Sequence, residues 1–239
     1  RVAARHGAHI VALPVDADGL DPQALPAGML DAIIVTPSHQ YPLGGSLPLA
    51  RRRELLAWAA RTGAVIVEDD YDSELRHSGS PLPTLAALDD PREGSVVLLG
   101  TFSKTVSQAL AAGYLLAPER LRTMIAPVRH DLGGQASSVV QAALAEYLAS
   151  GELRRHTARM RRRYAARRNL VLERLSGLPG VGIRPMSGGL HAVLDFGTGA
   201  AAREAELRVM RRSAPLQLGA VALSEYWQGR PGGAAGFGL

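Results

Sequence analysis

Apolar runs and amphipathic stretches alternate along the first half of the chain. Four short apolar runs with the character of buried strands cover residues 8–14, 31–36, 64–68 and 95–100. Residues 48–61 have apolar side chains at helical spacing, and the arginines at 51–53 fall on the opposite, solvent-facing side. Strands that alternate with helices are typical of an α/β fold with a mostly parallel sheet and right-handed crossovers.

The second half of the chain has a different pattern. We expect a helix at residues 139–149, capped by Ser137 and with its apolar face in the core. A long arginine-rich helix at 152–175 follows, and beyond it strands near 188–196 and 218–223 enclose a helix at 200–212. The run Arg161-Arg162-Arg163 could indicate DNA binding, but its apolar neighbours favour a solvated connecting helix.

These patterns divide the chain into three parts. Residues 1–150 form a large α/β domain, residues 151–176 a connecting helix and residues 177–239 a smaller α+β domain. The chain starts in what looks like the middle of a helix and stops at what looks like the start of a strand. We therefore expect a fragment whose large domain lacks its amino-terminal part and whose small domain is incomplete.

Lys104 is the residue that most clearly indicates covalent chemistry. It is the only lysine among 27 basic residues, and it follows a predicted strand and a short polar turn. A lysine amine can lose its proton and condense with an aldehyde, whereas a guanidinium cannot. The sequence therefore predicts a Schiff-base lysine, with an ordinary surface lysine as the alternative.

Hydroxyls and acids accompany Lys104 at the carboxyl ends of two predicted strands, where open α/β sheets place their ligands. Thr101 and Ser103 would suit a phosphate. Asp69 and Tyr71 follow the preceding strand, where two adjacent acids can equally form a turn or a helix cap. An acid against the ring nitrogen is what allows pyridoxal phosphate (PLP) to act as an electron sink, so the acids fit an aldehyde cofactor.

Three ordered sequence blocks carry a resemblance to a known family. They read Thr36-Pro-Ser-His-Gln-Tyr-Pro-Leu-Gly44, Glu68-Asp-Asp-Tyr-Asp-Ser-Glu74 and Gly100-Thr-Phe-Ser-Lys104. Together they resemble the aminotransferase-like domain of the MocR subgroup of GntR-type bacterial transcription regulators, which is similar to fold-type I PLP-dependent aminotransferases. Two later runs, Gly151-Glu-Leu-Arg-Arg-His156 and Met160-Arg-Arg-Arg-Tyr164, extend the resemblance over most of the chain.

The resemblance implies a fold, a cofactor and a set of site residues. The large domain would be a mostly parallel sheet with helices on both faces, and Lys104 would hold PLP as a Schiff base. Asp69 would face the pyridine nitrogen and Tyr71 the ring hydroxyl. Thr101 and Ser103 would bind the phosphate. His39 and Gln40 would lie in the loop beside the ring, although His39 alone would read as a solvated turn histidine.

Two departures from the family pattern bear on cofactor binding. Ala111 stands where the family has an arginine that contacts the phosphate, and such a charge-assisted contact contributes about 1.5–3 kcal/mol. The family's phosphate-binding loop, ring-stacking aromatic residue and winged helix-turn-helix precede the point that corresponds to Arg1. No arginine stands at the place matching the substrate-carboxylate arginine of aminotransferases.

Composition limits the remaining possibilities. The chain of 239 residues is 46% hydrophobic and contains no cysteine, so disulfides and thiolate metal sites are excluded. We expect a cytoplasmic protein because the sequence has neither a membrane-spanning apolar run nor a signal pattern. The net charge of +5 is spread over helices with acids between the arginines, so we expect DNA binding only through a domain outside this chain.

Three functions remain open at this stage. The first is a regulatory domain that senses an amine or amino-acid ligand through PLP and, by resemblance, forms a homodimer. The second is a working aminotransferase in which Lys104 also moves the α-proton. The third is a degenerate domain that retains the fold for dimerisation. Ala111 and the missing arginine disfavour the second, and the motifs favour the first.

Overall fold

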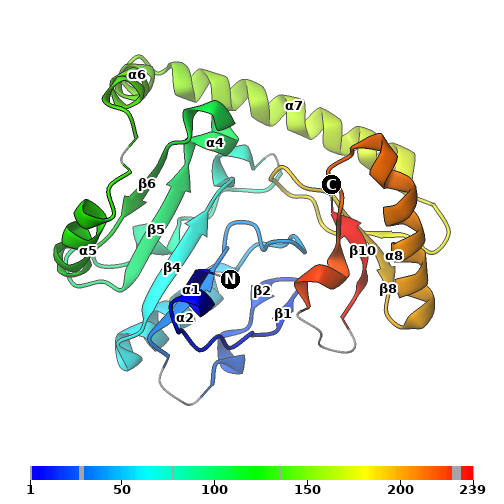
Figure 1. Ribbon diagram of the computed structural model, residues 1–239, viewed down its shortest axis with the longest axis horizontal. Helices are drawn as coiled ribbons and strands as arrows, with labels where there is room; N and C mark the ends of the chain where they lie inside the picture. Colours follow the sequence, from blue (N-terminus) through cyan, green and yellow to red (C-terminus); the bar gives the residue numbers. More distant parts are fainter. Residues whose placement is uncertain (1, 27–29, 77, 135, 228–232, 239) are drawn as a thin grey trace.

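The computed structural model describes residues 2–26, 30–76, 78–134, 136–227 and 233–238. Two four-stranded sheets lie near opposite ends of the long helix α7 (Glu152–Leu175), which runs across the top of the molecule (Figure 1). The predicted bounds of this helix, 152–175, are confirmed. Its arginine-rich sequence leaves only Thr157 buried, as expected for a solvated helix.

The larger sheet has the strand order β3-β4-β5-β6. Its strands are β3 (Ala32–Val35), β4 (Val65–Asp70), β5 (Val96–Thr101) and β6 (Gly113–Leu116). The pairs β3–β4 and β4–β5 are parallel and β6 is antiparallel to β5. This mostly parallel sheet confirms the predicted α/β class. Strand β4 extends two residues beyond the predicted end, so Asp69 and Asp70 belong to the strand and do not form a turn.

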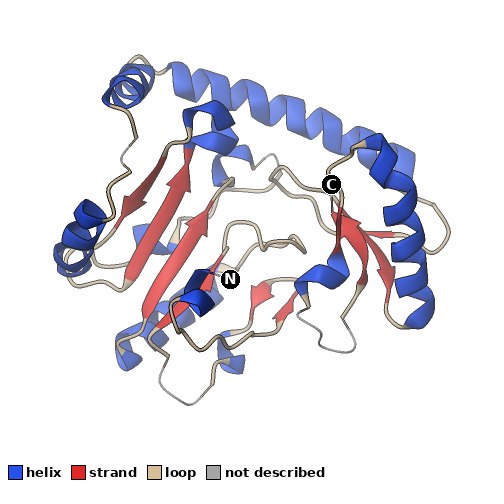
Figure 2. Ribbon diagram, in the orientation of Figure 1, coloured by secondary structure: helices blue, strands red, loops and turns tan. Residues whose placement is uncertain are grey.

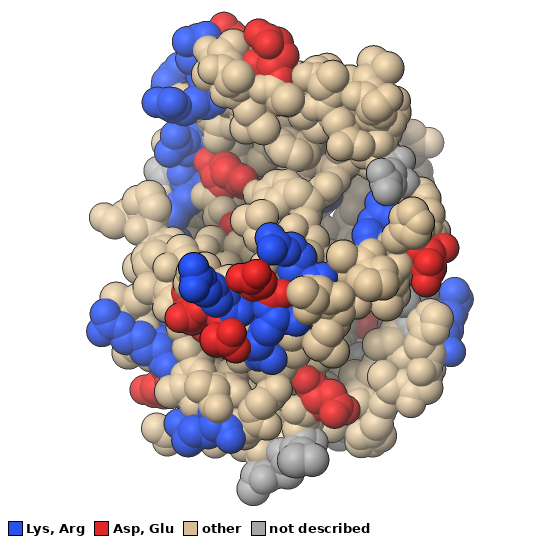
Figure 3. Space-filling view, turned by 90° about the vertical axis from the view of Figure 1, so that its left-hand side faces the viewer, with Lys and Arg blue, Asp and Glu red and all other residues tan. Residues whose placement is uncertain are grey.

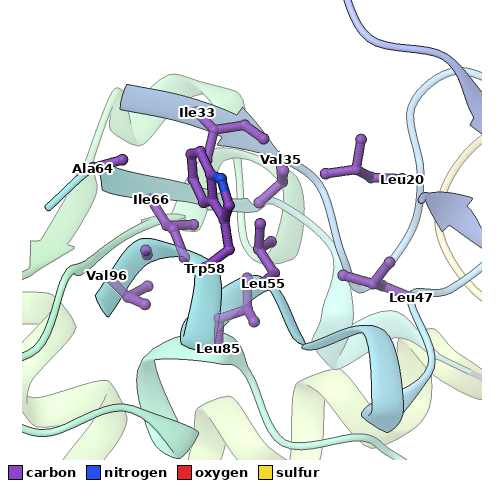
Figure 4. Packing of buried hydrophobic residues seen from close by; sticks show 11 residues of the cluster. Leu20, Ile33, Val35, Leu47, Leu55, Trp58, Ala64, Ile66, Leu85 and Val96 are labelled. Carbon is purple, nitrogen blue, oxygen red and sulfur yellow. The ribbon is translucent and has the colours of Figure 1, made fainter. Parts of the chain in front are cut away.

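Helix α2 (Leu49–Thr62) covers one face of this sheet. Leu55 and Trp58 pack against apolar side chains of β3 and β4, including Ile33 and Ile66 (Figure 4). The helix ends at Gly63, whose φ of 76° is the left-handed conformation that glycine adopts at low cost. The predicted helix and its stop are both confirmed.

Arg52 overturns the expectation that the arginines at 51–53 all face solvent. Its side chain is fully buried, whereas Arg53 is exposed. The guanidinium donates to the carbonyl oxygens of Leu47, Pro37 and Pro83 at 2.7–2.9 Å, and lies 3.9 Å from Glu68. Amphipathic spacing did not predict the burial of this arginine, because three carbonyl oxygens from separate parts of the chain accept the hydrogen bonds of its guanidinium inside the protein.

The face of the sheet opposite α2 is more open in the described part of the chain. Ile34 of β3 is 70% exposed and Leu115 of β6 is 43% exposed. Helix α6 (Ser138–Ala149) was expected to bury its apolar face, but only Leu144 is buried and Val139 is 75% exposed. Ser137 occupies the predicted cap position without making a side-chain capping bond.

The second sheet has the order β7-β8-β10-β9 and is antiparallel where its pairings are defined. Its strands are β7 (Gly182–Ile183), β8 (Val193–Gly197), β9 (Val221–Ala222) and β10 (Ala235–Gly238). Helix α8 (Ala200–Ser213) lies beside β8 and β10 (Figure 1). Buried Glu206 of α8 accepts hydrogen bonds from the backbone N–H groups of Ser224 and Gly236, both at 3.0 Å.

Short elements connect these parts. A hairpin of β1 (Val15–Asp16) and β2 (Gly19–Leu20) forms at the predicted turn. The expected strand at 8–14 is absent from the described structure, because those residues pair with no other strand there. The other elements are α1 (Val2–Arg5), η1 (Pro22–Ala24), η2 (Ser73–Leu75), α3 (Leu85–Leu88), α4 (Phe102–Thr105), η3 (Gln108–Leu110), α5 (Glu119–Asp131), η4 (Ala214–Leu216) and η5 (Leu223–Tyr226).

Charge is mixed over the side of the molecule shown in Figure 3. Basic and acidic side chains lie interspersed across the middle of this face, and no large area of one sign dominates it. None of the described helices has the length and apolar character needed to cross a membrane.

Candidate functional site

The carboxyl ends of β4 and β5 place the first candidate residues on one face of the sheet. Both strands point toward α7 (Figure 2). Asp69 pairs in register with Leu99, and Thr101 lies two residues beyond Leu99 on the same strand. Because side chains two residues apart share a face, Asp69 and Thr101 project from the same face, opposite α2.

Lys104 lies in the single helical turn α4 that directly follows β5. Thr101 begins this turn, and its hydroxyl oxygen accepts a hydrogen bond from the backbone N–H of Ser103 at 3.1 Å. The Lys104 side chain is exposed and makes no hydrogen bond or ion pair with the residues that the structure describes. The cap therefore presents a free amine at the end of the strand.

The Asp69 carboxylate also has no hydrogen-bond or ion-pair partner within the described ranges. Its side chain is half-buried, and burial, followed by the negative charges of Asp70 and Asp72, raises its pKa. A cationic N–H donor placed against Asp69 would relieve both the missing partner and the repulsion. A protonated pyridine nitrogen is a donor of this kind, so Asp69 fits the ring end of PLP.

Tyr71 and His39 are brought together beside this face. The Tyr71 hydroxyl donates to the carbonyl oxygen of His39 at 3.2 Å, and burial raises the pKa of Tyr71 strongly. The imidazole Nδ1 of buried His39 lies 3.0 Å from Asp72 Oδ2. His39 is thus held by a carboxylate inside the protein, which overturns its interpretation as a solvated turn residue.

Gln40 makes its side-chain contacts with Tyr41 and the β1–β2 hairpin. Its side-chain amide donates to the carbonyl oxygen of Tyr41 at 3.3 Å, and its Oε1 lies beside Gly19 in the β1–β2 hairpin. The structure shows no contact between this side chain and Lys104, Asp69 or Thr101 among the described residues.

Three aromatic side chains that the sequence did not single out form a cluster with Tyr71: Tyr41 and His191 contact its ring, and Tyr226 contacts Tyr41. The ring centroid of Tyr41 is 6.1 Å from that of Tyr71, 5.2 Å from His191 and 5.5 Å from Tyr226. The hydroxyls of Tyr41 and Tyr226 are 2.7 Å apart. No sequence signal connects residues so distant along the chain, although His191 follows a Gly-Gly pair that could have marked a functional loop.

His191 is the imidazole of this aromatic cluster. Burial is the main cause that lowers its pKa, the negative charge of Asp72 opposes this, and the charges of His39 and Lys104 lower the pKa further. The aromatic cluster consists of Tyr41, Tyr71, His191 and Tyr226, and the lowered pKa favours the neutral form of its imidazole.

The phosphate end of the site is less complete. Thr101 and Ser103 provide hydroxyl groups, but Ala111 follows the short helix η3 with a left-handed φ of 44° and provides only a methyl group. The available residues thus fit the ring and the aldehyde of PLP well. They fit its phosphate through hydroxyls, without the charge that an arginine at position 111 would supply.

Comparisons with known sequences agree with these features. The family model of aminotransferase class I and II matches residues 2–212. The HTH-type pyridoxine biosynthesis transcriptional regulator PdxR of Corynebacterium glutamicum is 47% identical over 223 residues, which cover 93% of this chain and 47% of the regulator. The probable rhizopine catabolism regulatory protein MocR of Rhizobium meliloti is 41% identical over 168 residues, covering 70% of this chain and 33% of that protein. The chain thus spans less than half the length of either relative.

Solved structures show the same fold. Pyrococcus horikoshii kynurenine aminotransferase matches with a TM-score of 0.75 and 25% identity, over 83% of this chain and 52% of that one. An archaeal alanine:glyoxylate aminotransferase matches with a TM-score of 0.83 over 98% of this chain and 59% of that one, at 24% identity. Fold, motifs and sequence similarity agree, and the chain belongs to the aminotransferase class I and II family, in a form similar to the aminotransferase-like part of MocR-type regulators.

Proposed function

We propose that this chain is the PLP-binding, ligand-sensing domain of a bacterial transcription regulator, with the cofactor attached to Lys104. The observation that carries the proposal is that two groups without partners among the described residues lie at the carboxyl ends of adjacent strands: the half-buried carboxylate of Asp69 on β4, and the free amine of Lys104 in α4, directly after β5. Family membership implies PLP as the cofactor. The similarity to regulators supports the sensing role.

Each candidate residue has a role in this proposal. The cofactor supplies an aldehyde and a ring that accepts electron density. Lys104 provides the nucleophilic amine, and Asp69 would accept a hydrogen bond from the protonated ring nitrogen. Thr101 and Ser103 would donate hydroxyls to the phosphate. Tyr71, oriented by its bond to the His39 carbonyl, would lie near the ring oxygen.

His39 and Gln40 have weaker roles. We assign His39 a positioning role through its backbone carbonyl, which accepts the Tyr71 hydroxyl, and this is supported by the contact of its ring Nδ1 with Asp72. Gln40 would maintain the contact between this loop and the β1–β2 hairpin, and we assign it no contact with the cofactor.

The proposed ligand is a small amine or amino acid that reaches the aldehyde beside the aromatic cluster. Tyr41 and Tyr71 come from the large-sheet part, while His191 and Tyr226 come from the small-sheet part. A ligand between them would favour one relative position of residues 1–150 and 177–239, which we propose as two domains joined by the helix at 151–176. Such a ligand shifts the population of two states by its difference in affinity for them.

The partners of the whole protein follow from the same proposal. DNA would be bound by another domain of the regulator, and the regulator would act in the cytoplasm as a homodimer. The two relatives named as transcription regulators support the DNA-binding role. The exposed apolar side chains of Ile34 and Val139 would be available for contacts with further parts of the protein.

Aminotransferase activity is the second candidate function. The fold shared with kynurenine aminotransferase favours it, and Lys104 would then also transfer the α-proton of the substrate. Ala111 counts against it because turnover requires a firmly held cofactor. A domain that retains only dimerisation is the third candidate. It would not explain why the amine of Lys104 and the carboxylate of Asp69 lack partners among the described residues.

An absorbance titration with PLP tests the proposal. The parent protein should acquire a visible absorption band that saturates, and Lys104→Ala should not acquire it. Lys104→Arg is the matched control because it retains the charge but cannot condense with an aldehyde. If both variants bind PLP with the same band as the parent, the proposed attachment is wrong.

The same sample separates sensing from turnover. After loading with PLP, the protein is mixed with a panel of primary amines and amino acids, together with a 2-oxo acid that accepts the amino group and regenerates PLP, and the keto-acid or aldehyde product of the amine is assayed. A sensor should show a lasting spectral change without product accumulation. Release of product over many turnovers would instead establish the aminotransferase.

A further inference from the structure

A cavity borders the candidate cofactor site. It has a volume of about 530 Å³ and lies between the loop that contains His39, the short helix η2 and the first half of α7. Lys104, Asp69 and Thr101 do not line it. The ring of His39 and the carboxylate of Asp72 form part of its wall, so this pair lies between the cavity and Tyr71.

Two arginines of α7 face this cavity. Arg154 and Arg161 are seven residues apart, which places them about two turns apart on the same side of the helix. Buried Thr157 lies between them on the cavity wall. Neither guanidinium has a hydrogen bond or an ion pair with any residue that the structure describes.

A third arginine is fixed on the opposite wall. Arg76 follows η2, and its Nε donates to the carbonyl oxygen of Ser78 at 3.0 Å while its Nη1 donates to the hydroxyl of Ser46 at 3.2 Å. These neutral acceptors orient the side chain without cancelling its charge. Arg52 also reaches the cavity, but three carbonyl oxygens and Glu68 already satisfy it.

Acidic groups in the wall offset only part of this charge. Asp72 is engaged with His39, and Glu74 is the other carboxylate that lines the cavity. Arg76, Arg154 and Arg161 therefore exceed the acids, and the two on α7 lack partners. Cationic side chains gathered around a cavity repel one another unless an anion enters between them.

We propose that this cavity binds a small anion that carries a carboxylate or a phosphate group, held by Arg154 and Arg161 from α7 and by Arg76 from the opposite wall. Guanidinium groups match both oxyanions through paired N–H donors. Gly188 and Gly189 of the small-sheet part also line the cavity, so an anion here would contact all three parts of the chain. The site is independent of the proposed attachment of PLP.

Calorimetric titration with inorganic phosphate, and in parallel with succinate, tests the proposal on the protein loaded with PLP and on the protein without it. We expect saturable binding of at least one probe in both forms. Arg154→Gln and Arg161→Gln should each weaken it tenfold or more. Arg163→Gln is the matched control: it is an exposed arginine of the same helix, about 200° around the axis from Arg161, and should leave binding unchanged.

Two further variants make the result specific to this cavity. Glu74→Gln removes a carboxylate from the wall and should tighten binding severalfold, which is opposite to the effect of the arginine variants. Thr101→Ala alters the proposed phosphate site of the cofactor, and in the protein without PLP it should leave the binding that depends on Arg154 and Arg161 in place.

The proposal is overturned if the parent binds neither probe, if Arg163→Gln weakens binding as much as Arg161→Gln, or if Glu74→Gln weakens it. Phosphate binding that depends on Thr101 and not on Arg154 or Arg161 would also overturn it, because the ion would then occupy the cofactor site. These results do not depend on Lys104, so failure here leaves the proposed function standing.

Discussion

The imidazole Nδ1 of His39 lies 3.0 Å from the carboxylate Oδ2 of Asp72, although 33 residues separate them along the chain. Both groups are buried, and Gly189 of the small-sheet part packs against both. This three-way contact joins the loop after β3, the end of β4 and the segment before β8. It is one of the places where the two sheet-bearing parts meet beside the candidate site, together with the contacts of Tyr41 with His191 and Tyr226.

Gly189→Ala should disrupt this junction. A Cβ at Gly189 would overlap His39 Nδ1 and Asp72 Oδ2, and the φ of 81° disfavours a side chain. We expect a loss of about 1–2 kcal/mol from backbone strain, and a further loss of about 1–3 kcal/mol from overpacking. Denaturant unfolding measures the sum.

Gly180→Ala is the control for the strain component. Its φ is 73°, and a Cβ there would meet no atom within 4 Å. It should lose only the strain contribution. Equal losses at the two positions would show that the contact of Gly189 with His39 and Asp72 does not constrain the junction.

Arg52→Ala should destabilise the fold far more than substitution of an exposed arginine, because Arg52 is buried. It would leave Glu68 buried without its cation and the carbonyl oxygens of Leu47, Pro37 and Pro83 without a donor. We expect a loss of about 3–5 kcal/mol in the free energy of unfolding. Exposed Arg53→Ala should change it by less than about 0.5 kcal/mol. Similar effects at both positions would contradict the buried network.

Asp70→Asn should change how stability depends on pH. Burial raises the pKa of Asp70 above its ordinary value of 3.8, although the Ser73 hydroxyl donates to it at 2.6 Å. The folded protein therefore holds this proton to higher pH than the unfolded chain, and ionisation destabilises the fold as the pH rises above 3.8. The stability of Asp70→Asn relative to the parent should thus increase across that range.

Asp90→Asn should show the opposite trend. The backbone N–H groups of Glu93 and Arg92 lower the pKa of Asp90, so its ionised form stabilises the fold above 3.8. Relative to the parent, this variant should lose stability as the pH rises from the lowered pKa of Asp90 to just above 3.8. Urea unfolding from about pH 2 to pH 8 covers this range and that of Asp70. Parallel profiles for both variants would contradict the assigned signs.

Ala111→Arg should strengthen cofactor binding. A charge-assisted contact with the phosphate contributes about 1.5–3 kcal/mol, which corresponds to a ten- to hundredfold lower Kd for PLP. The left-handed backbone at position 111 is kept, since alanine already adopts it. Ala111→Gln is the uncharged control, and it should give a smaller gain. An unchanged Kd in Ala111→Arg would show that position 111 does not face the phosphate.

Local periodicity predicted much of the fold. The long helix at 152–175 and the strands around residues 32–35 and 96–101 were accessible because their spacing is repeated over enough residues. The prediction of a strand at 8–14 was wrong because apolar character does not supply a pairing partner. The prediction that α6 buries its apolar face was wrong for a related reason, since burial depends on what packs against a helix.

The candidate site was predictable only in part. Lys104, Thr101 and Ser103 are adjacent in sequence, so a single motif identified them. Arg52 and His39 looked solvent-exposed because their acceptors come from other loops. His191 and Tyr226 join Tyr41 across more than 140 residues of chain, and no periodicity in one sequence records such a contact.

The most direct measurement is the location of the cofactor after chemical trapping. The protein is incubated with PLP, reduced with borohydride and digested, and the modified peptide is identified by mass spectrometry. The account predicts a phosphopyridoxyl group on Lys104, and at most labelling of the amino terminus in Lys104→Arg, which contains no lysine. Labelling confined to the amino terminus, or an unmodified Lys104 at saturating PLP, would contradict it.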